Sequence, residues 1–235
     1  MPATAMTTDA GLYRLMTWLS PAFPVGAYSY SHGIETAVEA GLVRDADTLA
    51  RWVETVVTFG SGRMDATVFR LTYAAVAAGD TAAFEDAAER GALYRGTAEL
   101  ALESNAQGEA FLGTVAAAWP LSGLAVWQGR LDTASYPVAV AMVAALAEID
   151  EAAALGAYLT AFAGNLVNAG VRLIPLGQTD GQKALAKLEA PVTAQVETTC
   201  ATDTETLTAD FGAAIPMVDW TSAAHETQYT RLFRS

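Results

Sequence analysis

The stretch Leu49–Val56, which reads LARWVETV, decides the fold class of this chain. Its apolar residues recur at the i, i+3, i+4 and i+7 spacing, namely Leu49, Trp52, Val53 and Val56. That spacing places them on one face of an α-helix. Asp47 stands just before them and is the expected N-cap. The same spacing from Leu12 to Leu19 predicts another amphipathic helix, which must stop near Pro21.

Helical patterns and residues that end helices alternate along most of the chain. The predicted helices cover residues 12–19, 49–56, 65–79, a short stretch after Asp80, 93–119, 136–147, 151–173 and 179–190. Gly79 is expected as a C-cap, Thr179 and Gln182 as a capping box, and Pro191 as the end of the last of these helices.

Residues 192–208 are ambiguous, because Val192, Ala194 and Val196 alternate as in a strand. No second strand is available to pair with them, and an isolated strand leaves its amides unsatisfied, so a helix is predicted there. The predicted fold is therefore all-α. It is a single domain over residues 1–235, built as an irregular bundle of roughly eight to ten helices.

Composition narrows the class of partner. Hydrophobic residues make up 52% of the 235 residues, which is enough for a packed core. Thirteen basic residues against 26 acidic ones leave a net charge of −13, which repels nucleic acids and anionic membrane surfaces. We expect neither as a partner. A single cysteine, no signal-peptide pattern and no apolar run long enough to span a bilayer predict a cytoplasmic protein.

Catalytic and metal sites are poorly supported. The good metal ligands are His32, His225 and Cys200, and no closely spaced pair of ligands is present. Within one chain we therefore predict no metal site, although a site shared across a dimer axis stays open. There is no Gly-Lys-Ser/Thr phosphate loop, and Ser31 lacks the glycine and the strand of a nucleophile elbow. We predict no catalytic residues.

Three segments stand out from the helical background. Residues 20–33 hold two prolines, two glycines and three aromatic residues, and they form either a rigid loop packed on the bundle or an aromatic docking surface. Residues 171–182 read as a helix connector, but Arg172, Gln178 and Gln182 could bind an anion or a partner's backbone. Residues 225–235 are locally basic and aromatic, and either this chain or another must cover their apolar groups.

These three segments, in this order, resemble the UreF family of urease accessory proteins. The resemblance rests on Ser20–Glu35 (SPAFPVGAYSYSHGIE), Pro175–Gln182 (PLGQTDGQ) and His225–Ser235 (HETQYTRLFRS). Weaker agreement lies between them, at Asp65, Arg95, Glu99, Leu100, Ser104, Gln107 and Gly108, while Ala101 stands where the family has an arginine.

The resemblance implies an all-α, homodimeric, non-catalytic adaptor. Family members bridge a UreD/UreH-type accessory protein to the UreG-type GTPase and modulate that GTPase while nickel is inserted into apo-urease. No tightly bound cofactor is implied, and nickel is handled transiently by the complex. The alternative is a free-standing helical nickel-binding carrier.

The resemblance also implies roles for individual residues. The expected partner-binding residues are Tyr28, Ser29, Tyr30, Glu35, Arg172, Gln178, Gln182, His225, Glu226, Tyr229, Arg231, Phe233 and Arg234. The expected structural residues of the two loops are Pro21, Pro24, Gly26, Gly33, Pro175, Gly177 and Thr179. We expect residues 225–235 to be a docking tail for the UreD-type protein that is loosely ordered without it.

Overall fold

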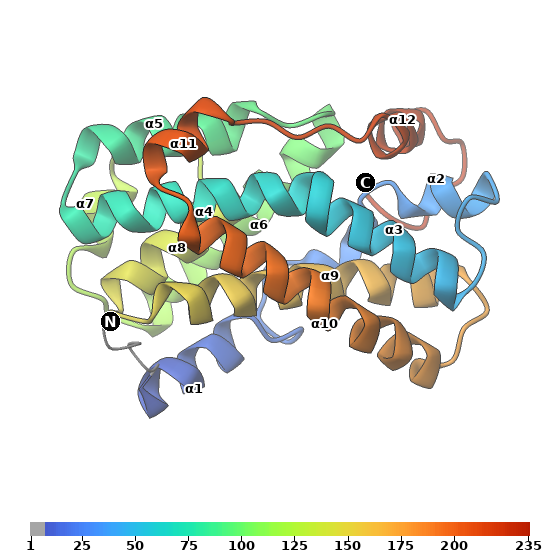
Figure 1. The fold of residues 1–235 in the computed structure, drawn as a ribbon, viewed down its shortest axis with the longest axis horizontal. Coiled ribbons are helices and arrows are strands. Elements are labelled where there is room, and N and C mark those ends of the chain that lie inside the picture. The colour runs from blue at the N-terminus through green and yellow to red at the C-terminus, as the bar shows by residue number, and fades with distance from the viewer. Residues whose placement is uncertain (1–7) are drawn as a thin grey trace.

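A computed structural model of the chain describes residues 8–235, and in that range it forms helices and connecting loops without a strand (Figure 1). The elements in chain order are α1 (Asp9–Trp18), the 3-10 turn η1 (Ala27–Ser29), α2 (Ile34–Glu39), α3 (Ala46–Phe59), α4 (Ser61–Ala78), α5 (Thr81–Leu93), α6 (Ala98–Ala118), α7 (Leu124–Gln128), α8 (Tyr136–Leu146), α9 (Glu151–Leu173), α10 (Gln178–Ala201), α11 (Thr204–Ala209) and α12 (Pro216–His225).

The all-α prediction is confirmed. Twelve α-helices are present among the described residues, which is more than the eight to ten expected. Three of the twelve, α2, α7 and α11, have only five or six residues. Helices this short bury too few apolar positions to show a periodic pattern. The predicted helices match eight of the nine longer ones, and α12 was missed.

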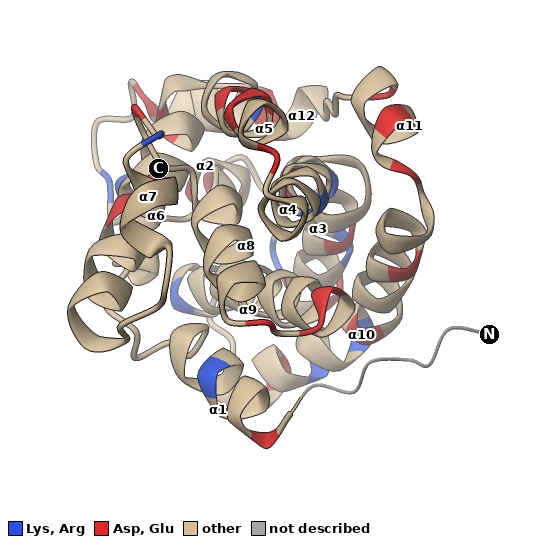
Figure 2. Ribbon diagram, turned by 90° about the vertical axis from the view of Figure 1, so that its left-hand side faces the viewer, with Lys and Arg blue, Asp and Glu red and all other residues tan. Residues whose placement is uncertain are grey.

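Helix α8 lies at the centre of the bundle, and Figure 2 shows the other helices around it. Its sequence YPVAVAMVAAL has no charged residue, and Tyr136 to Ala144 are all buried. Helices α4, α6 and α9 pack against it, and the small alanine side chains let them approach closely. No helix in residues 8–235 is long and apolar enough to cross a membrane.

Several predicted helix ends agree with the structure, and one cap is wrong. Helix α9 has the predicted bounds, Gly79 ends α4 in the left-handed conformation (φ 69°), and Asp80 caps α5. The N-cap of α3 is Asp45 rather than Asp47, because Asp45 and Thr48 form a reciprocal capping box. Asp47 lies in the first turn of α3, where its carboxylate pairs with Lys187 at 2.6 Å.

Helix α10 begins within one residue of the predicted start near Thr179, but the predicted capping box and the predicted end are wrong. Gly177 is the N-cap and makes no side-chain capping bond, so Thr179 and Gln182 form no capping box. Pro191 lies inside α10, which continues to Ala201. Proline costs one backbone hydrogen bond, but Leu188 and Val192 on either side of it are buried, and the packing of α10 against α3 and α9 offsets that cost. The helical prediction for residues 192–208 is confirmed.

Two predicted breaks also lie elsewhere. The helix predicted over residues 93–119 starts later than expected. Leu93 is the last residue of α5, and α6 begins only at Ala98, where the Thr97 side chain caps it. The break expected at residues 60–62 is confined to Gly60, and Gly62 is already helical. A Cβ atom on Gly62 would lie 2.5 Å from Val57 Cα, so the close packing of α4 on the end of α3 requires glycine.

Candidate functional site

The chain's last residues lie along the loop between α1 and α2. Arg234 donates its backbone N–H to the carbonyl of Ser29 at 2.8 Å, and Ser31 donates its N–H to the carbonyl of Ser235 at 2.7 Å. The Ser31 hydroxyl donates to the same carbonyl. Residues 20–33 and 225–235 were identified as separate segments in the sequence, and the structure joins them by hydrogen bonds.

Arg172 joins the second segment to the other two. It lies at the end of α9, and its guanidinium donates to the carbonyl of Tyr28. The same guanidinium lies 4.4 Å above the centre of the Phe233 ring. This cation–π contact holds the buried Phe233 side chain against α9.

Glu35 is the residue that fixes the tail. It lies in the first turn of α2 and is buried, although its carboxylate pairs with no lysine or arginine among residues 8–235. The backbone N–H groups of Leu232 and Phe233 donate to its two oxygens at 2.7 and 3.0 Å. The ring of His225 contacts the same carboxylate at 3.1 Å. One carboxylate thus accepts two backbone N–H groups of the last eleven residues and contacts the ring of a third residue among them.

His225 is completely buried between two carboxylates. Its Nε2 atom faces Glu35 and its Nδ1 atom lies 2.8 Å from Glu99, which also accepts from Arg231 at 2.9 Å. Both ring nitrogens thus face carboxylate oxygens at hydrogen-bond distance, and neither is directed at open space where a metal ion could bind.

A third carboxylate, Glu103, completes the arrangement. It accepts the Ser235 hydroxyl at 2.9 Å and lies 3.3 Å from His32 Nδ1, while His32 Nε2 contacts the Ser61 hydroxyl at 2.8 Å. We call Glu35, Glu99 and Glu103 together the carboxylate cluster. The sequence analysis missed Glu103, although the i, i+4 spacing of Glu99 and Glu103 on α6 places both on one helix face.

The expectation that the tail is loosely ordered without a partner is wrong for its buried residues. His225, Phe233 and Ser235 are buried by this chain's own loop and helices, because the carboxylate cluster offers acceptors for the tail's donors. Tyr229 is fully exposed and Leu232 is largely exposed. The interpretation of a tail folded on the chain's own acidic groups is therefore correct for His225, Arg231, Phe233 and Ser235, whereas the Tyr229 and Leu232 side chains stay exposed.

The predicted partner-binding residues divide into two groups. Those that the structure brings together around the tail are Tyr28, Ser29, Tyr30, Glu35, Arg172, His225, Arg231, Phe233 and Arg234. Four others, Gln178, Gln182, Glu226 and Tyr229, are exposed and make no side-chain hydrogen bond within residues 8–235. Gln178 and Gln182 lie on the first turns of α10.

The predicted loop residues lie between helices, except Thr179, which lies in the first turn of α10. Gly26 and Gly33 have φ values of 74° and 77°, a conformation that favours glycine. Gly33 also lies against α12, where an added Cβ would meet Ser222 N at 3.0 Å. Pro21, Pro24 and Pro175 are exposed.

The residues of weaker family agreement lie inside the bundle. Asp65 accepts from Arg95 Nη1 and from the Tyr158 hydroxyl, each at 2.6 Å. The Ser104 hydroxyl accepts the backbone N–H of Tyr136 at 3.3 Å, and Gly108 packs directly on the carbonyl of Ala134. These contacts join α4 to α9 and to the loop before α6, and they join α6 to the start of α8.

The three strongest metal ligands do not meet. Within residues 8–235 no group of three or more His, Cys, Asp and Glu side chains is arranged to hold a metal ion. Cys200 is half-buried near the end of α10, and burial, followed by the nearby Glu151 carboxylate, raises its thiol pKa to about 11. Cysteine binds metal ions well only as the thiolate, so Cys200 is a poor nickel ligand at neutral pH.

We expect Cys200 to be slow to alkylate. A rise in pKa from 9.0 to about 11 lowers the thiolate fraction about 100-fold at neutral pH. The iodoacetamide reaction should therefore be about 100-fold slower than in the urea-unfolded chain, and its rate should rise about tenfold per pH unit between pH 7 and pH 10. A rate that levels off near pH 9 would contradict the raised pKa.

Comparisons with known proteins show the family of this chain. The family model of UreF matches residues 43–189. The urease accessory protein UreF of Granulibacter bethesdensis is 49% identical over 233 residues, covering 99% of this chain and 97% of that protein. The protein of the same name from Rhodopseudomonas palustris strain HaA2 is 49% identical over 227 residues, covering 96% and 94%. That of Bradyrhizobium diazoefficiens is 48% identical over 230 residues. This chain belongs to the UreF family.

Proposed function

We propose that this chain is a cytoplasmic, non-catalytic urease accessory protein. In this role it acts as a homodimeric adaptor that joins a UreD/UreH-type protein to a UreG-type GTPase. The adaptor modulates that GTPase and helps to insert nickel into apo-urease. The observation that carries the proposal is the 49% identity to a urease accessory protein over 99% of this chain.

The ordered tail supplies a surface for the UreD-type partner. The carboxylate cluster holds the tail backbone, so that Tyr28, Tyr229 and Leu232 remain exposed beside Arg231 and Arg234. Exposed aromatic and aliphatic side chains on a fixed backbone bind with little loss of conformational entropy. The two arginines place positive charge at the edge of this surface, in a protein whose net charge is −13. They would pair with acidic groups of the partner.

Capture of the partners from a co-expressing cell tests the proposal. The chain should co-purify with the UreD-type protein, and with the GTPase when all three are present, and it should restore urease activity to cells lacking their own UreF-type protein. Leu232→Ala should lower the captured UreD-type protein about tenfold or more, without a change in melting temperature, because Leu232 is 65% exposed.

Val126→Ala is the matched control. Val126 is 67% exposed and lies on α7, at the end of the molecule opposite to the C-terminus in Figure 1. Failure of the unaltered chain to capture either partner or to restore urease activity would refute the adaptor role. Equal capture by the Leu232 variant and the unaltered chain would instead refute only the assigned surface.

A free-standing nickel carrier is the second candidate, and nickel titration of the purified chain separates it from the adaptor. We expect micromolar affinity or weaker, because His225 is enclosed by carboxylates and Cys200 is held as the thiol. A stoichiometric nanomolar site in calorimetry would favour the carrier.

A further inference from the structure

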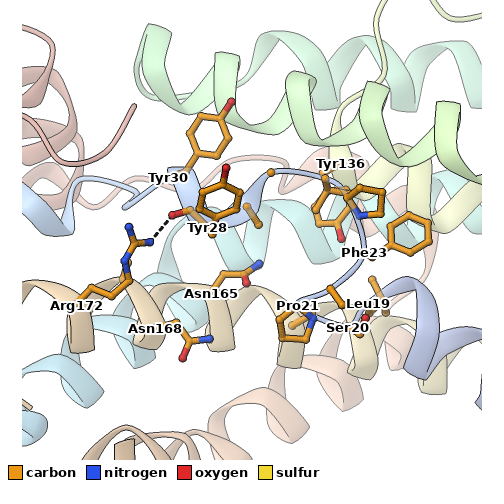
Figure 3. A pocket seen from close by; sticks show the side chains of 17 residues that line it. Leu19, Ser20, Pro21, Phe23, Tyr28, Tyr30, Tyr136, Asn165, Asn168 and Arg172 are labelled. Carbon is orange, nitrogen blue, oxygen red and sulfur yellow. Dashed lines mark hydrogen bonds between the residues drawn. The ribbon is translucent and has the colours of Figure 1, made fainter. Parts of the chain in front are cut away.

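A cavity of about 240 Å³ lies beneath the loop between α1 and α2 (Figure 3). The loop covers one side, and α9 together with the first residue of α8 forms the other. Apolar side chains such as Phe23 and Val25 supply part of the wall. The adaptor role proposed above makes no use of this space.

Tyr136 places an unpaired hydroxyl in the cavity. The residue is only 6% exposed, yet its hydroxyl makes no hydrogen bond to any residue in the range 8–235. The neighbouring buried tyrosine, Tyr158, donates to Asp65, as buried tyrosine hydroxyls usually find a partner. Burial raises the pKa of Tyr136, which keeps it a neutral donor. Figure 3 shows its hydroxyl and the Asn165 side chain turned toward the space between the loop and α9.

On the α9 side of the lining the polar side chains are two amides and one cation. Asn165 and Asn168 lie one turn apart on α9, and neither side chain makes a hydrogen bond within the described part of the chain. Arg172, one further turn along, is the only charged residue among those that line the cavity. In a chain with 26 acidic residues, a lining with a guanidinium and no carboxylate selects for an anion.

The volume of the cavity limits the size of the ligand. A cavity of about 150 Å³ is enough to hold benzene, so this one fits a molecule of about six to ten non-hydrogen atoms. A carboxylate matches the planar guanidinium of Arg172, and the apolar wall fits a short carbon chain. A second polar atom would meet the Tyr136 hydroxyl, because Figure 3 shows Tyr136 and Arg172 at opposite ends of the lining.

We propose that this cavity binds a small organic carboxylate. Its carboxylate faces Arg172, and a second oxygen-bearing group, at the other end of a short carbon chain, accepts a hydrogen bond from the Tyr136 hydroxyl.

Titration of the purified, isotope-labelled chain with 4-oxopentanoate tests the site by nuclear magnetic resonance. This probe has a carboxylate at one end and a ketone acceptor near the other. The Asn165 side-chain amide and the backbone amides of residues 19–30 should shift and saturate at millimolar concentration. The uncharged 4-oxopentanamide has nearly the same shape and should bind at least about tenfold more weakly, because it lacks the charge that Arg172 recognises.

Tyr136→Phe tests the second contact. It should weaken 4-oxopentanoate binding about three- to tenfold and leave pentanoate, which lacks the ketone, unaffected. Its melting temperature without ligand should not fall, since the hydroxyl has no partner to lose. Tyr73→Phe is the matched control, because the Tyr73 hydroxyl donates to the Ile149 carbonyl away from the cavity. That variant should melt at a lower temperature and bind the probe normally.

Three results would overturn the proposal: no shift of the loop and Asn165 resonances, equal binding of the acid and the amide, or unchanged 4-oxopentanoate binding in Tyr136→Phe. Each of these measurements uses the chain alone, so its outcome is independent of whether the chain captures urease partners.

Discussion

Asp65→Asn is expected to lower the free energy of unfolding by about 3–5 kcal/mol, the usual result of breaking a buried ion pair by removing one charge. Asp65 and Arg95 have side chains that are only 5% and 6% exposed, and they meet at 2.6 Å. Burial alone would lower the pKa of Arg95, but the Asp65 carboxylate more than offsets this and raises it. Arg95 therefore stays charged, and asparagine would leave that charge without a counterion.

The Tyr158 hydroxyl depends on the same carboxylate. It donates to Asp65 at 2.6 Å, and its pKa is raised well above the ordinary value, first by burial and then by the Asp65 charge. Asparagine keeps an oxygen for only one of these two donors. For a chain of this length, a loss of 3–5 kcal/mol corresponds to a fall in melting temperature of roughly 10 °C.

Asp47→Asn is the matched control for Asp65→Asn. Asp47 pairs with Lys187 at the same 2.6 Å distance, but both side chains are more than half exposed. An exposed pair contributes at most about 1 kcal/mol, so the control should melt within about 2–4 °C of the unaltered chain. Similar losses in both variants, measured by calorimetry, would show that burial does not set the strength of the Asp65 pair.

The parts of the fold that were predicted correctly are those specified by local sequence. Helix α9 has the predicted bounds because an acidic N-cap, a long apolar pattern and a following proline lie within one short stretch. The end of α10 was mispredicted at Pro191, because its continuation depends on packing against α3 and α9, which are distant in sequence. Local rules describe what a residue prefers and not what its neighbours in space can offset.

The candidate site shows the same limit. The sequence marked His225, Arg231 and Phe233, but it did not indicate which acidic groups hold them. His225 and Glu35 are 190 residues apart in the chain, and no periodic pattern relates residues at that separation. The unpaired hydroxyl of Tyr136 was equally hidden, because an isolated tyrosine at the start of an apolar helix is typical of a packed core residue.

Glu35→Gln should release the tail from the bundle. The carboxylate accepts the backbone N–H groups of Leu232 and Phe233 and contacts His225, whereas glutamine turns one of the two oxygens into a donor. A buried donor that loses a charged acceptor costs about 1.5–3 kcal/mol, so the variant should lose about 3 kcal/mol or more in free energy of unfolding. Amide hydrogen exchange at Leu232 and Phe233 should become at least about tenfold faster.

Glu39→Gln is the matched control, because Glu39 lies one turn further along the same helix and is exposed. Its exchange rates and melting temperature should stay close to those of the unaltered chain. If the tail is the surface for the UreD-type partner, Glu35→Gln should also lower the captured amount, since the freed tail must then be ordered at binding. Normal protection of Leu232 and Phe233 in the Glu35 variant would mean that Arg172 and the backbone bonds to Ser29 and Ser31 suffice to hold the tail, and that Glu35 does not fix it.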